Sequence, residues 1–352
     1  MIPHNKPTIG KEESSAAARV LQSGWIAEGI EVKRFEDEFC KYLGYKPGHA
    51  LAVSSGTAAL YMALTSLDIK EGDEVIIPTY VCSALLNAIY LAKGKPVLVD
   101  VSCDDFNISF EETQKKITSQ TKAIIVPHIF GMPADIDKFT SLNIPIIEDC
   151  AQAIGAEING KKVGTFGRVA IFSFYASKLL TTGYGGMVFS KDKNIINKAR
   201  DYREFDCRQE YYPRFNFLMT DFQAAVGRAQ LKKLKSFLNR RSKIAVEYYK
   251  ALSKEKVWPS KSASIKKSIF YRFIVRDSQP ETLKIFMEKK GIKTIIPIES
   301  YELLHRYLGE NPQDFPVSEQ IAKTTLSLPI YPSLSSVEVK KIKSALNSYY
   351  EK

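Results

Sequence analysis

The sequence lacks the features that mark membrane-spanning, secreted and zinc-binding proteins. No run of 18 or more apolar residues occurs among its 352 residues, so we expect no transmembrane helix and no membrane partner. Residues 1–7 contain no apolar signal core, which argues against secretion. The five cysteines are scattered and form no CxxC pair, which argues against a disulfide framework or a zinc site. We therefore expect a cytoplasmic protein without a bound metal.

Motifs for nucleic-acid binding are also absent, although the formal net charge is +11. We find no helix-turn-helix, RNP or zinc-finger pattern. Much of the positive charge lies on segments such as residues 232–235 and 340–343, which are typical of the solvated faces of amphipathic helices. A basic protein suits an anionic small molecule as well as a nucleic acid, and charge alone is weak evidence. We expect no nucleic-acid partner.

Short apolar runs alternate with helical patterns through the first half of the chain. The runs are rich in Val and Ile and mostly do not alternate with polar residues, as is typical of strands buried on both faces of a largely parallel sheet. The predicted strands are residues 50–54, 74–78, 96–101, 123–129, 145–149, 169–174 and 186–190. Helical patterns between them include residues 57–67 and 83–92. This order predicts an α/β fold.

The chain is long enough for two domains. Residues 219–252 are typical of one long helix, and after Pro259 the composition shifts to Lys and Ser. A strand pattern at residues 269–275 and helical patterns at residues 279–290 and 336–350 follow. We predict a large domain over residues 1–239, including the N-terminal segment, and a smaller α+β domain over residues 240–352.

One lysine lies between two of the predicted core strands. Lys178 follows the apolar run 169–174 and precedes the apolar stretch 187–189 across a turn of small residues. A buried charge is costly unless it is paired or chemically used. The chemical use of a buried lysine is as a nucleophile that forms a Schiff base with a carbonyl. An exposed lysine at a strand-to-turn edge is the ordinary alternative, and the surrounding segments decide between the two.

Two other predicted strands end in residues that suit a small ligand. In an open α/β sheet, ligands bind beyond the carboxyl ends of the strands. Ser55, Gly56 and Thr57 stand at a helix start, where free N–H groups bind phosphate. Asp149 is a candidate partner for a protonated ring nitrogen, and Gln152 could donate to a ring oxygen. A plain N-cap and a helix-terminal aspartate are the ordinary alternatives.

Further residues belong to the same predicted crevice. Ser173 ends the strand before Lys178, where its hydroxyl suits a phosphate, although a strand serine bonded to backbone is the simpler alternative. A side chain from residues 78–87 could cover one face of a flat ring. His128 is a further candidate, although a buried core histidine is commoner. A phosphate cradle, a carboxylate for a pyridinium and a Schiff-base lysine together describe a pyridoxal phosphate site.

Taken in order, these segments resemble the DegT/DnrJ/StrS family of sugar aminotransferases, which are fold-type I pyridoxal phosphate enzymes and usually homodimers. The resemblance runs nearly from end to end. It rests on SGWIAEG at 23–29, SSGT at 54–57, EDCAQ at 148–152, SFYASK at 173–178, NFLMTDFQAA at 216–225 and LSLPIYP at 326–332. It implies an aspartate-aminotransferase-like fold, in which a large domain with a mostly parallel seven-stranded sheet precedes a smaller C-terminal α+β domain.

The resemblance also implies roles for individual residues. Lys178 would form the Schiff base, Asp149 would keep the pyridine nitrogen protonated, and Gln152 would lie near the ring hydroxyl. Asn216 would reach the phosphate of the neighbouring subunit, so that each site needs a homodimer. The expected cofactor-binding residues are Ser55, Gly56, Thr57, Cys82, Asp149, Gln152, Ser173, Lys178 and Asn216.

The sequence departs from the family pattern at three positions. Cys82 stands where the family often has an aromatic residue over the cofactor ring. Tyr184 replaces the common glutamate of a Thr-Thr-Gly-Glu-Gly-Gly run, and Leu218 replaces a common arginine. The last two concern substrate contacts rather than the cofactor. The candidate substrate residues are Tyr184, His128 and His305.

The activity implied by the resemblance is transfer of an amino group from an amino acid, expected to be L-glutamate, to a keto-sugar nucleotide. The product would serve the biosynthesis of amino sugars for surface polysaccharides or glycosides. A keto-cyclitol or a related ketone is an alternative acceptor. An alternative of another class is a catalytically silent binding or regulatory protein with the same fold. Some family members are dehydratases with histidine at the lysine position, and Lys178 argues against that branch.

Overall fold

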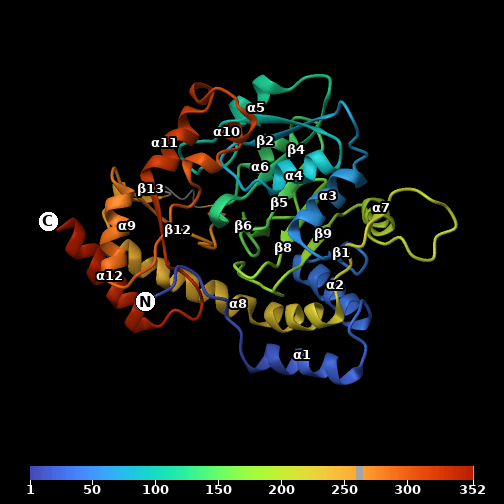
Figure 1. Cartoon of the computed structure of the whole chain (residues 1–352), viewed down its shortest axis with the longest axis horizontal. Coiled ribbons are helices and arrows are strands. Elements are labelled where there is room, and N and C mark those ends of the chain that lie inside the picture. Colours follow the sequence, from blue (N-terminus) through green and yellow to red (C-terminus); the bar gives the residue numbers. More distant parts are fainter. Residues whose placement is uncertain (259–264, 352) are drawn as a thin grey trace.

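A seven-stranded sheet forms the centre of the computed structural model, which describes residues 1–258 and 265–351 (Figure 1). The strand order is β1-β9-β8-β5-β4-β2-β3. β9 is antiparallel to both of its neighbours, and the other strands run parallel to one another. The predicted α/β fold with a mostly parallel sheet is therefore confirmed.

The strands of this sheet lie within two residues of their predicted ends. Their continuous apolar runs are buried on both faces, which explains why the sequence pattern located them well. The strands are β1 (Ala50–Val53), β2 (Glu74–Pro78), β3 (Lys95–Val99), β4 (Thr121–Pro127), β5 (Ile146–Asp149), β8 (Val169–Ser173) and β9 (Gly186–Phe189).

Helices cover both faces of the sheet. Leu51 and Val53 of β1 face one core with α3 (Gly56–Ser66), α4 (Ala84–Leu91) and α7 (Lys193–Arg203). Ala50 and Ala52 face the opposite core. The helices of that second layer are α2 (Ile30–Leu43), α5 (Phe110–Lys116), α6 (Ile136–Thr140) and α8 (Asp221–Tyr249). Outside it, α1 (Lys11–Ser23) packs along α8 (Figure 1).

The C-terminal region has a core of its own. Its antiparallel sheet has the order β10-β12-β13. Its elements are η2 (Lys254–Lys256), β10 (Val257–Trp258), β12 (Phe273–Arg276), α9 (Pro280–Lys289), η3 (Ser300–Glu302), α10 (Leu304–Leu308), η4 (Pro312–Asp314), α11 (Pro316–Thr324), β13 (Thr325–Leu328) and α12 (Ser336–Tyr350). A third small sheet joins β11 (Lys266–Lys267), β6 (Glu157–Ile158) and β7 (Lys161–Lys162).

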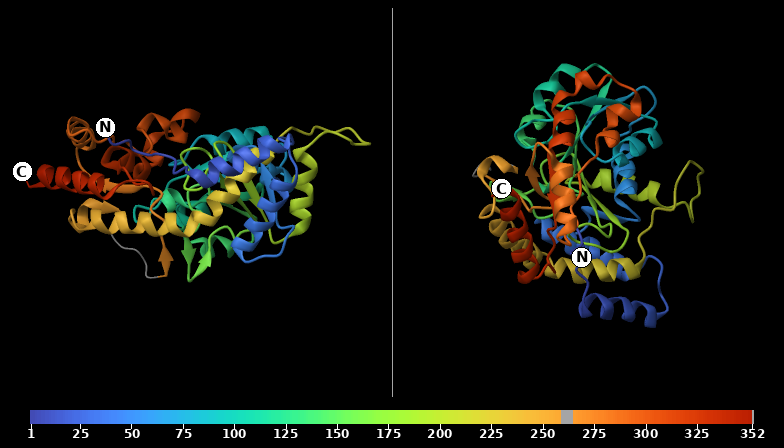
Figure 2. Two further views of the ribbon diagram at one scale, coloured as in Figure 1. Left: turned by 90° about the horizontal axis from the view of Figure 1, so that it is seen from below. Right: turned by 60° about the vertical axis from the view of Figure 1, so that its left-hand side comes forward.

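The N-terminal residues reach this C-terminal region. Ile2 donates to the carbonyl of Gly291 at 2.8 Å and packs in the same core, and Figure 2 shows the N-terminus among the C-terminal helices. Residue 240 lies inside α8, so no break in the chain marks the predicted boundary after residue 239. The division into two domains stays a prediction. Within residues 1–258 and 265–351, every helix is too short or too polar to span a lipid bilayer.

The strand predicted at residues 269–275 is wrong over its first half. β12 begins only at Phe273. The preceding residues dock instead on η1 (Ile129–Gly131), where Ile269 donates to the Gly131 carbonyl at 3.1 Å and Arg272 to the Phe130 carbonyl at 3.3 Å. Their backbone hydrogen-bonding groups therefore meet a loop at the end of β4 rather than a strand edge, a contact that local pattern does not reveal.

The first prediction concerns Phe39 of α2, whose ring is fully buried against Phe172 and Phe174 at the end of β8. Phe39→Ala leaves a cavity at this junction and is expected to lower the free energy of unfolding by about 3–5 kcal/mol. Denaturant titration measures the change. Ile285→Ala, at a side chain that is 53% exposed, serves as the control and should change it little. Equal effects of the two substitutions would contradict this packing.

Candidate active site

A cavity of about 260 Å³ lies at the carboxyl ends of the central strands. All but two of the predicted site residues line it, namely Ser55, Gly56, Thr57, Cys82, His128, Asp149, Gln152, Ser173, Lys178 and Tyr184. They come from β1, β2, β4, β5 and β8 and from the turns that follow these strands. The parallel strands therefore bring distant sequence segments to one place, as expected for an open α/β sheet.

The start of α3 forms the small, polar end of the cavity. The Ser55 hydroxyl caps the helix by accepting from the Ala58 N–H at 3.0 Å. A methyl group on Gly56 would come within 2.8 Å of the Ser173 β-carbon, so only glycine lets the end of β8 approach the helix start. The first N–H groups of a helix have no partner within it. Together with the hydroxyls of Thr57 and Ser173, they surround a space suited to an anion.

Asp149 supplies a buried carboxylate to the cavity. Its Oδ1 accepts from the Ala151 N–H at 2.9 Å, and no hydrogen bond within the described residues engages its Oδ2. Burial raises the pKa of Asp149, although the Ala151 hydrogen bond and the charge of Lys178 act in the opposite direction. A cationic N–H donor that bound Oδ2 would stabilise the charged carboxylate.

Glu148, the preceding residue, does not line the cavity but joins the elements around it. Its side chain is fully buried and accepts from the backbone N–H groups of Gly164, Phe166 and Gly167 at 2.6–2.7 Å. Burial alone would raise the pKa of Glu148, but these bonds and the contact with His128 lower it below its ordinary value. The carboxylate therefore joins β5 to the loop that precedes β8.

His128 is held by the same network. Its Nδ1 accepts from the Ala134 N–H at 3.0 Å, so its Nε2 carries the proton that is donated to Glu148 at 3.2 Å. With both nitrogens engaged, His128 lines the cavity with its ring and not with a free polar atom. His128, Glu148 and Cys150 bring ligand atoms within 4.8 Å of one another. The ligand atoms of His128 and Glu148 are already hydrogen-bonded to other protein groups. The expectation of no bound metal stays a prediction.

Gln152 has a fixed orientation. Its side-chain oxygen accepts from the Phe130 N–H at 2.9 Å. The amide –NH₂ group is therefore the end left to a ligand, and Gln152 lines the cavity. The predicted function of Gln152 as a donor to a ring oxygen is compatible with this geometry.

Lys178 lies in the turn between β8 and β9 and is partly buried. Its backbone N–H donates to the Tyr175 carbonyl at 2.9 Å, and the side chain of Asn5 donates to the Ser177 carbonyl at 2.7 Å. Among the described residues no carboxylate forms an ion pair with Lys178. Its amine is therefore held near the cavity without being neutralised by a salt bridge.

Two tyrosines stand at the mouth of the cavity. Tyr184 is 63% exposed and meets Tyr175 edge-on at 5.3 Å between ring centroids. Tyr184 was predicted as a substrate residue, but Tyr175 was missed. The only signal for Tyr175 was its position three residues before Lys178 in the same turn. Cys82 is exposed and also lines the cavity.

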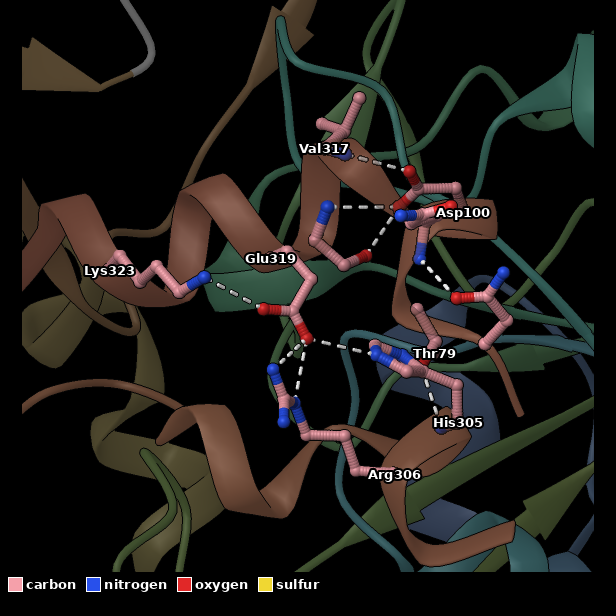
Figure 3. Close-up of polar contacts among 10 residues, drawn as sticks. Thr79, Asp100, His305, Arg306, Val317, Glu319 and Lys323 are labelled. Atoms are coloured by element: carbon pink, nitrogen blue, oxygen red, sulfur yellow. Dashed lines mark hydrogen bonds and ion pairs between the residues drawn. The ribbon is translucent and has the colours of Figure 1, made fainter. Parts of the chain in front are cut away.

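The structure does not bring His305 to this cavity, so its predicted substrate role is not supported. Nδ1 of His305 is hydrogen-bonded to the Thr79 hydroxyl at 2.7 Å, and its Nε2 is hydrogen-bonded to the Glu319 carboxylate at 3.1 Å (Figure 3). The ring is fully buried and stacks on Phe315 at 4.5 Å. His305 instead ties the end of β2 to the C-terminal helices.

Asn216 also lies outside the cavity of its own chain. It is exposed, between Phe215 and Phe217. The carbonyl of Phe217 accepts from the Ser54 N–H at 2.8 Å, which fixes this segment beside the start of α3. An exposed asparagine on a fixed segment is compatible with the predicted contact to a neighbouring subunit, and that contact stays a prediction.

The sheet order and the cavity at its carboxyl edge are those of the fold-type I aminotransferases. The model of the DegT/DnrJ/EryC1/StrS aminotransferase family matches residues 7–347, and the chain therefore belongs to this family and is an aminotransferase. The family resemblance found in the sequence is confirmed.

Characterised relatives match along almost their whole length. The chain is 33% identical to GDP-perosamine synthase of Escherichia coli O157:H7, over 99% of this chain and 98% of the relative. It is 35% identical to dTDP-3-amino-3,6-dideoxy-alpha-D-galactopyranose transaminase of Aneurinibacillus thermoaerophilus, over 96% and 95% of the two chains. The structure of the PLP form of Spr1654 from Streptococcus pneumoniae superposes with a TM-score of 0.89 at 26% identity, covering 99% of this chain and 98% of that one.

The second prediction concerns Glu148. Because its pKa is lowered in the folded protein, its stabilising effect is complete above the unfolded value of 4.5 and is lost as the pH falls through the folded pKa. Glu148→Gln should lower the free energy of unfolding at neutral pH by about 2–4 kcal/mol, because an amide cannot accept from all four donors. The difference from the wild type should shrink below pH 4.5.

Denaturant titration at neutral and acidic pH measures this difference. Glu281→Gln, at a carboxylate that is 61% exposed, is the matched control and should have little effect at either pH. A Glu148→Gln difference that stays constant with pH would contradict the charged state assigned to Glu148.

Proposed function

We propose that this aminotransferase uses pyridoxal 5'-phosphate (PLP) to move an amino group from L-glutamate to a keto-sugar nucleotide. The observation that carries the proposal is that Lys178, Asp149 and the start of α3 line a single cavity. A nucleophile, a buried carboxylate and an anion cradle match the three polar parts of PLP. The PLP form of the structural relative Spr1654 supports the same cofactor.

The residues of the cavity fit PLP group by group. The phosphate belongs at the start of α3, with Gly56, Thr57 and Ser173, where the absence of a side chain on Gly56 keeps the space open. The ring nitrogen belongs at Oδ2 of Asp149. The amide –NH₂ of Gln152 is the donor for the ring hydroxyl. Ser55 caps the helix, and Cys82, which also lines the cavity, would lie beside the ring.

Asp149 and Lys178 divide the acid–base work. Bound PLP supplies an electron sink for a carbanion. Asp149 holds the proton on the ring nitrogen, because a buried carboxylate with a free oxygen is stabilised by a cationic N–H partner. Lys178 would hold the cofactor covalently in the resting enzyme. Its released Nζ takes the proton from the donor α-carbon and returns it on the other side of the transfer.

The acceptor is too large to lie within the cavity. A volume of about 260 Å³ is below the usual range for ligand pockets, about 300–1,000 Å³. The sugar ring therefore enters past Tyr175 and Tyr184, and the nucleotide lies outside. The names of the two characterised relatives, which specify a GDP sugar and a dTDP sugar, support a nucleotide-linked acceptor. The net charge of +11 suits a diphosphate.

A homodimer with shared active sites is part of the proposal. Exposed aromatic side chains gather near the mouth of the cavity: Trp25, Tyr175, Tyr184 and Phe222 are each at least 38% exposed. The loop carrying Trp25 is joined to the start of α8 by the bond from the Asp221 N–H to the Ala27 carbonyl. Exposed aromatic residues beside a site are typical of a surface covered by a partner. Asn216 would then reach the partner's phosphate.

The third prediction tests the reaction. Purified protein with PLP should show the visible absorbance of a lysine-bound cofactor and should transfer nitrogen from glutamate to a member of a panel of keto-sugar nucleotides. Lys178→Ala removes the nucleophile and should abolish both signals, with a loss of activity of at least about 1,000-fold. Transfer only to keto-cyclitols would mean that the acceptor is a keto-cyclitol and not a keto-sugar nucleotide. Protein that binds no PLP would support the catalytically silent alternative.

The fourth prediction tests the shared site. Lys178→Ala and Asn216→Ala should each be nearly inactive. When the two variants are unfolded and refolded together, hybrid dimers contain one site with both wild-type residues, so about a quarter of the wild-type activity should return. Lys178→Ala refolded with itself is the control. An absence of recovery would mean that Asn216 serves its own chain's site or only folding.

A further inference from the structure

A tyrosine from the C-terminal region reaches the catalytic lysine proposed above. Lys178 Nζ lies over the ring of Tyr271, 5.1 Å from the ring centroid. The side chain of Ser177, the residue before the lysine, is among the groups that lower the pKa of Tyr271. Tyr271 precedes β12, whereas Lys178 lies in the turn after β8. The contact therefore joins two distant parts of the chain at the amine on which the reaction depends.

The backbone of Tyr271 is held firmly in this position. The Arg241 guanidinium of α8 donates to the carbonyls of Phe270 and Tyr271. The backbone nitrogen of Tyr271 lies close to Gly131, and a methyl group on that glycine would come within 2.9 Å of this nitrogen. The neighbouring Arg272 N–H donates to the Phe130 carbonyl at 3.3 Å. A residue fixed on both sides presents its side chain to Lys178 in one orientation.

The charges that act on Tyr271 are positive on every side. Lys178 comes from the turn after β8, Arg272 immediately precedes β12 and Arg241 comes from α8. The guanidinium carbon of Arg272 is 5.8 Å from the Tyr271 ring centroid. His4, from the N-terminal segment, lies close to both arginines, and burial together with their charges lowers its pKa to about 3, so it is neutral.

This environment favours the ionised form of the hydroxyl. Burial alone would raise the pKa of Tyr271, but Lys178, Arg272, the side chain of Ser177 and Arg241 together lower it to about 8. The other buried tyrosines differ, because burial raises the pKa of Tyr42, Tyr80 and Tyr248.

We propose that Tyr271 is a positioning residue for Lys178, which orients the amine and exchanges a proton with it. The proposal rests on the catalytic function assigned to Lys178. When Lys178 is released as an ammonium ion, the N–H bond breaks and an O–H bond forms on the phenolate of Tyr271. The pair keeps its net charge. Nζ is then a neutral amine that can accept the proton of the donor α-carbon.

Tyr271→Phe separates this role from simple packing, because it keeps the aromatic ring and removes only the hydroxyl. Tyr249→Phe is the matched control. Tyr249 packs edge-on against Phe270 and Phe273, on either side of Tyr271, and burial raises its pKa. The same atom is therefore removed from the same local cluster without touching Lys178.

The first measurement needs no cofactor. Tyrosinate absorbance of the cofactor-free protein is titrated in the wild type and the variants. One tyrosine should ionise near pH 8 in the wild type and in Tyr249→Phe, and this step should be absent from Tyr271→Phe. In Lys178→Met the step should move upward by at least about one pH unit, because the largest of the lowering charges is gone. A step that survives in Tyr271→Phe, or does not move in Lys178→Met, would overturn the proposal.

The second measurement follows the single-turnover reaction of the PLP-loaded enzyme with glutamate as a function of pH. Tyr271→Phe should keep the absorbance of lysine-bound cofactor, react at least about tenfold more slowly and lose the pH dependence near pH 8. A wild-type rate and pH profile in Tyr271→Phe would overturn the proposal while leaving the proposed function intact. Failure of the wild-type protein to bind PLP would instead reject the proposed function, and the tyrosinate titration would still test the Tyr271–Lys178 pair.

Discussion

The buried carboxylate of Glu148 is the interaction on which the geometry of the site depends. Three backbone N–H groups from the loop before β8 and the ring of His128 after β4 all donate to it. An ionised carboxylate is costly to bury unless its oxygens are satisfied, and here each oxygen has two donors. The ends of β4, β5 and β8 are therefore locked together. Asp149 follows Glu148 directly, and the turn with Lys178 follows β8.

The remaining parts of the site surround the hydrogen-bond network of Glu148 and come from separate elements. The start of α3 provides the proposed anion cradle, and η1 orients Gln152 through the Phe130 N–H. The C-terminal region adds Tyr271 beside Lys178, and His305 ties the end of β2 to α11 through Glu319. The cavity is thus built mainly from the large sheet, whereas the surroundings of the lysine also depend on α8 and β12. A change in how the C-terminal region packs would reach the amine directly.

Much of the fold and the centre of the site could be predicted from sequence for a local reason. Strands buried on both faces have continuous apolar runs, so β1 to β5, β8 and β9 were recognisable, and parallel strands bring their carboxyl ends to one edge. That rule brought Asp149, Ser173 and the start of α3 together. The failures have an equally physical cause. Residues 269–272 are apolar enough for a strand, but their N–H groups bond to η1, and His305 is polar but satisfied by Thr79 and Glu319.

Local apolar runs and short segments whose order along the chain is diagnostic were enough to assign the family and the α/β class, and to propose the lysine, the carboxylate and the phosphate cradle. The tertiary structure alone decided which polar side chains are free. Glu148 and Asp149 are adjacent carboxylates in the sequence, yet one is saturated by backbone donors and the other keeps an open oxygen. The contact between Tyr271 and Lys178 likewise arises from tertiary packing, because packing between distant segments sets the hydrogen-bond partners and the neighbouring charges of a side chain.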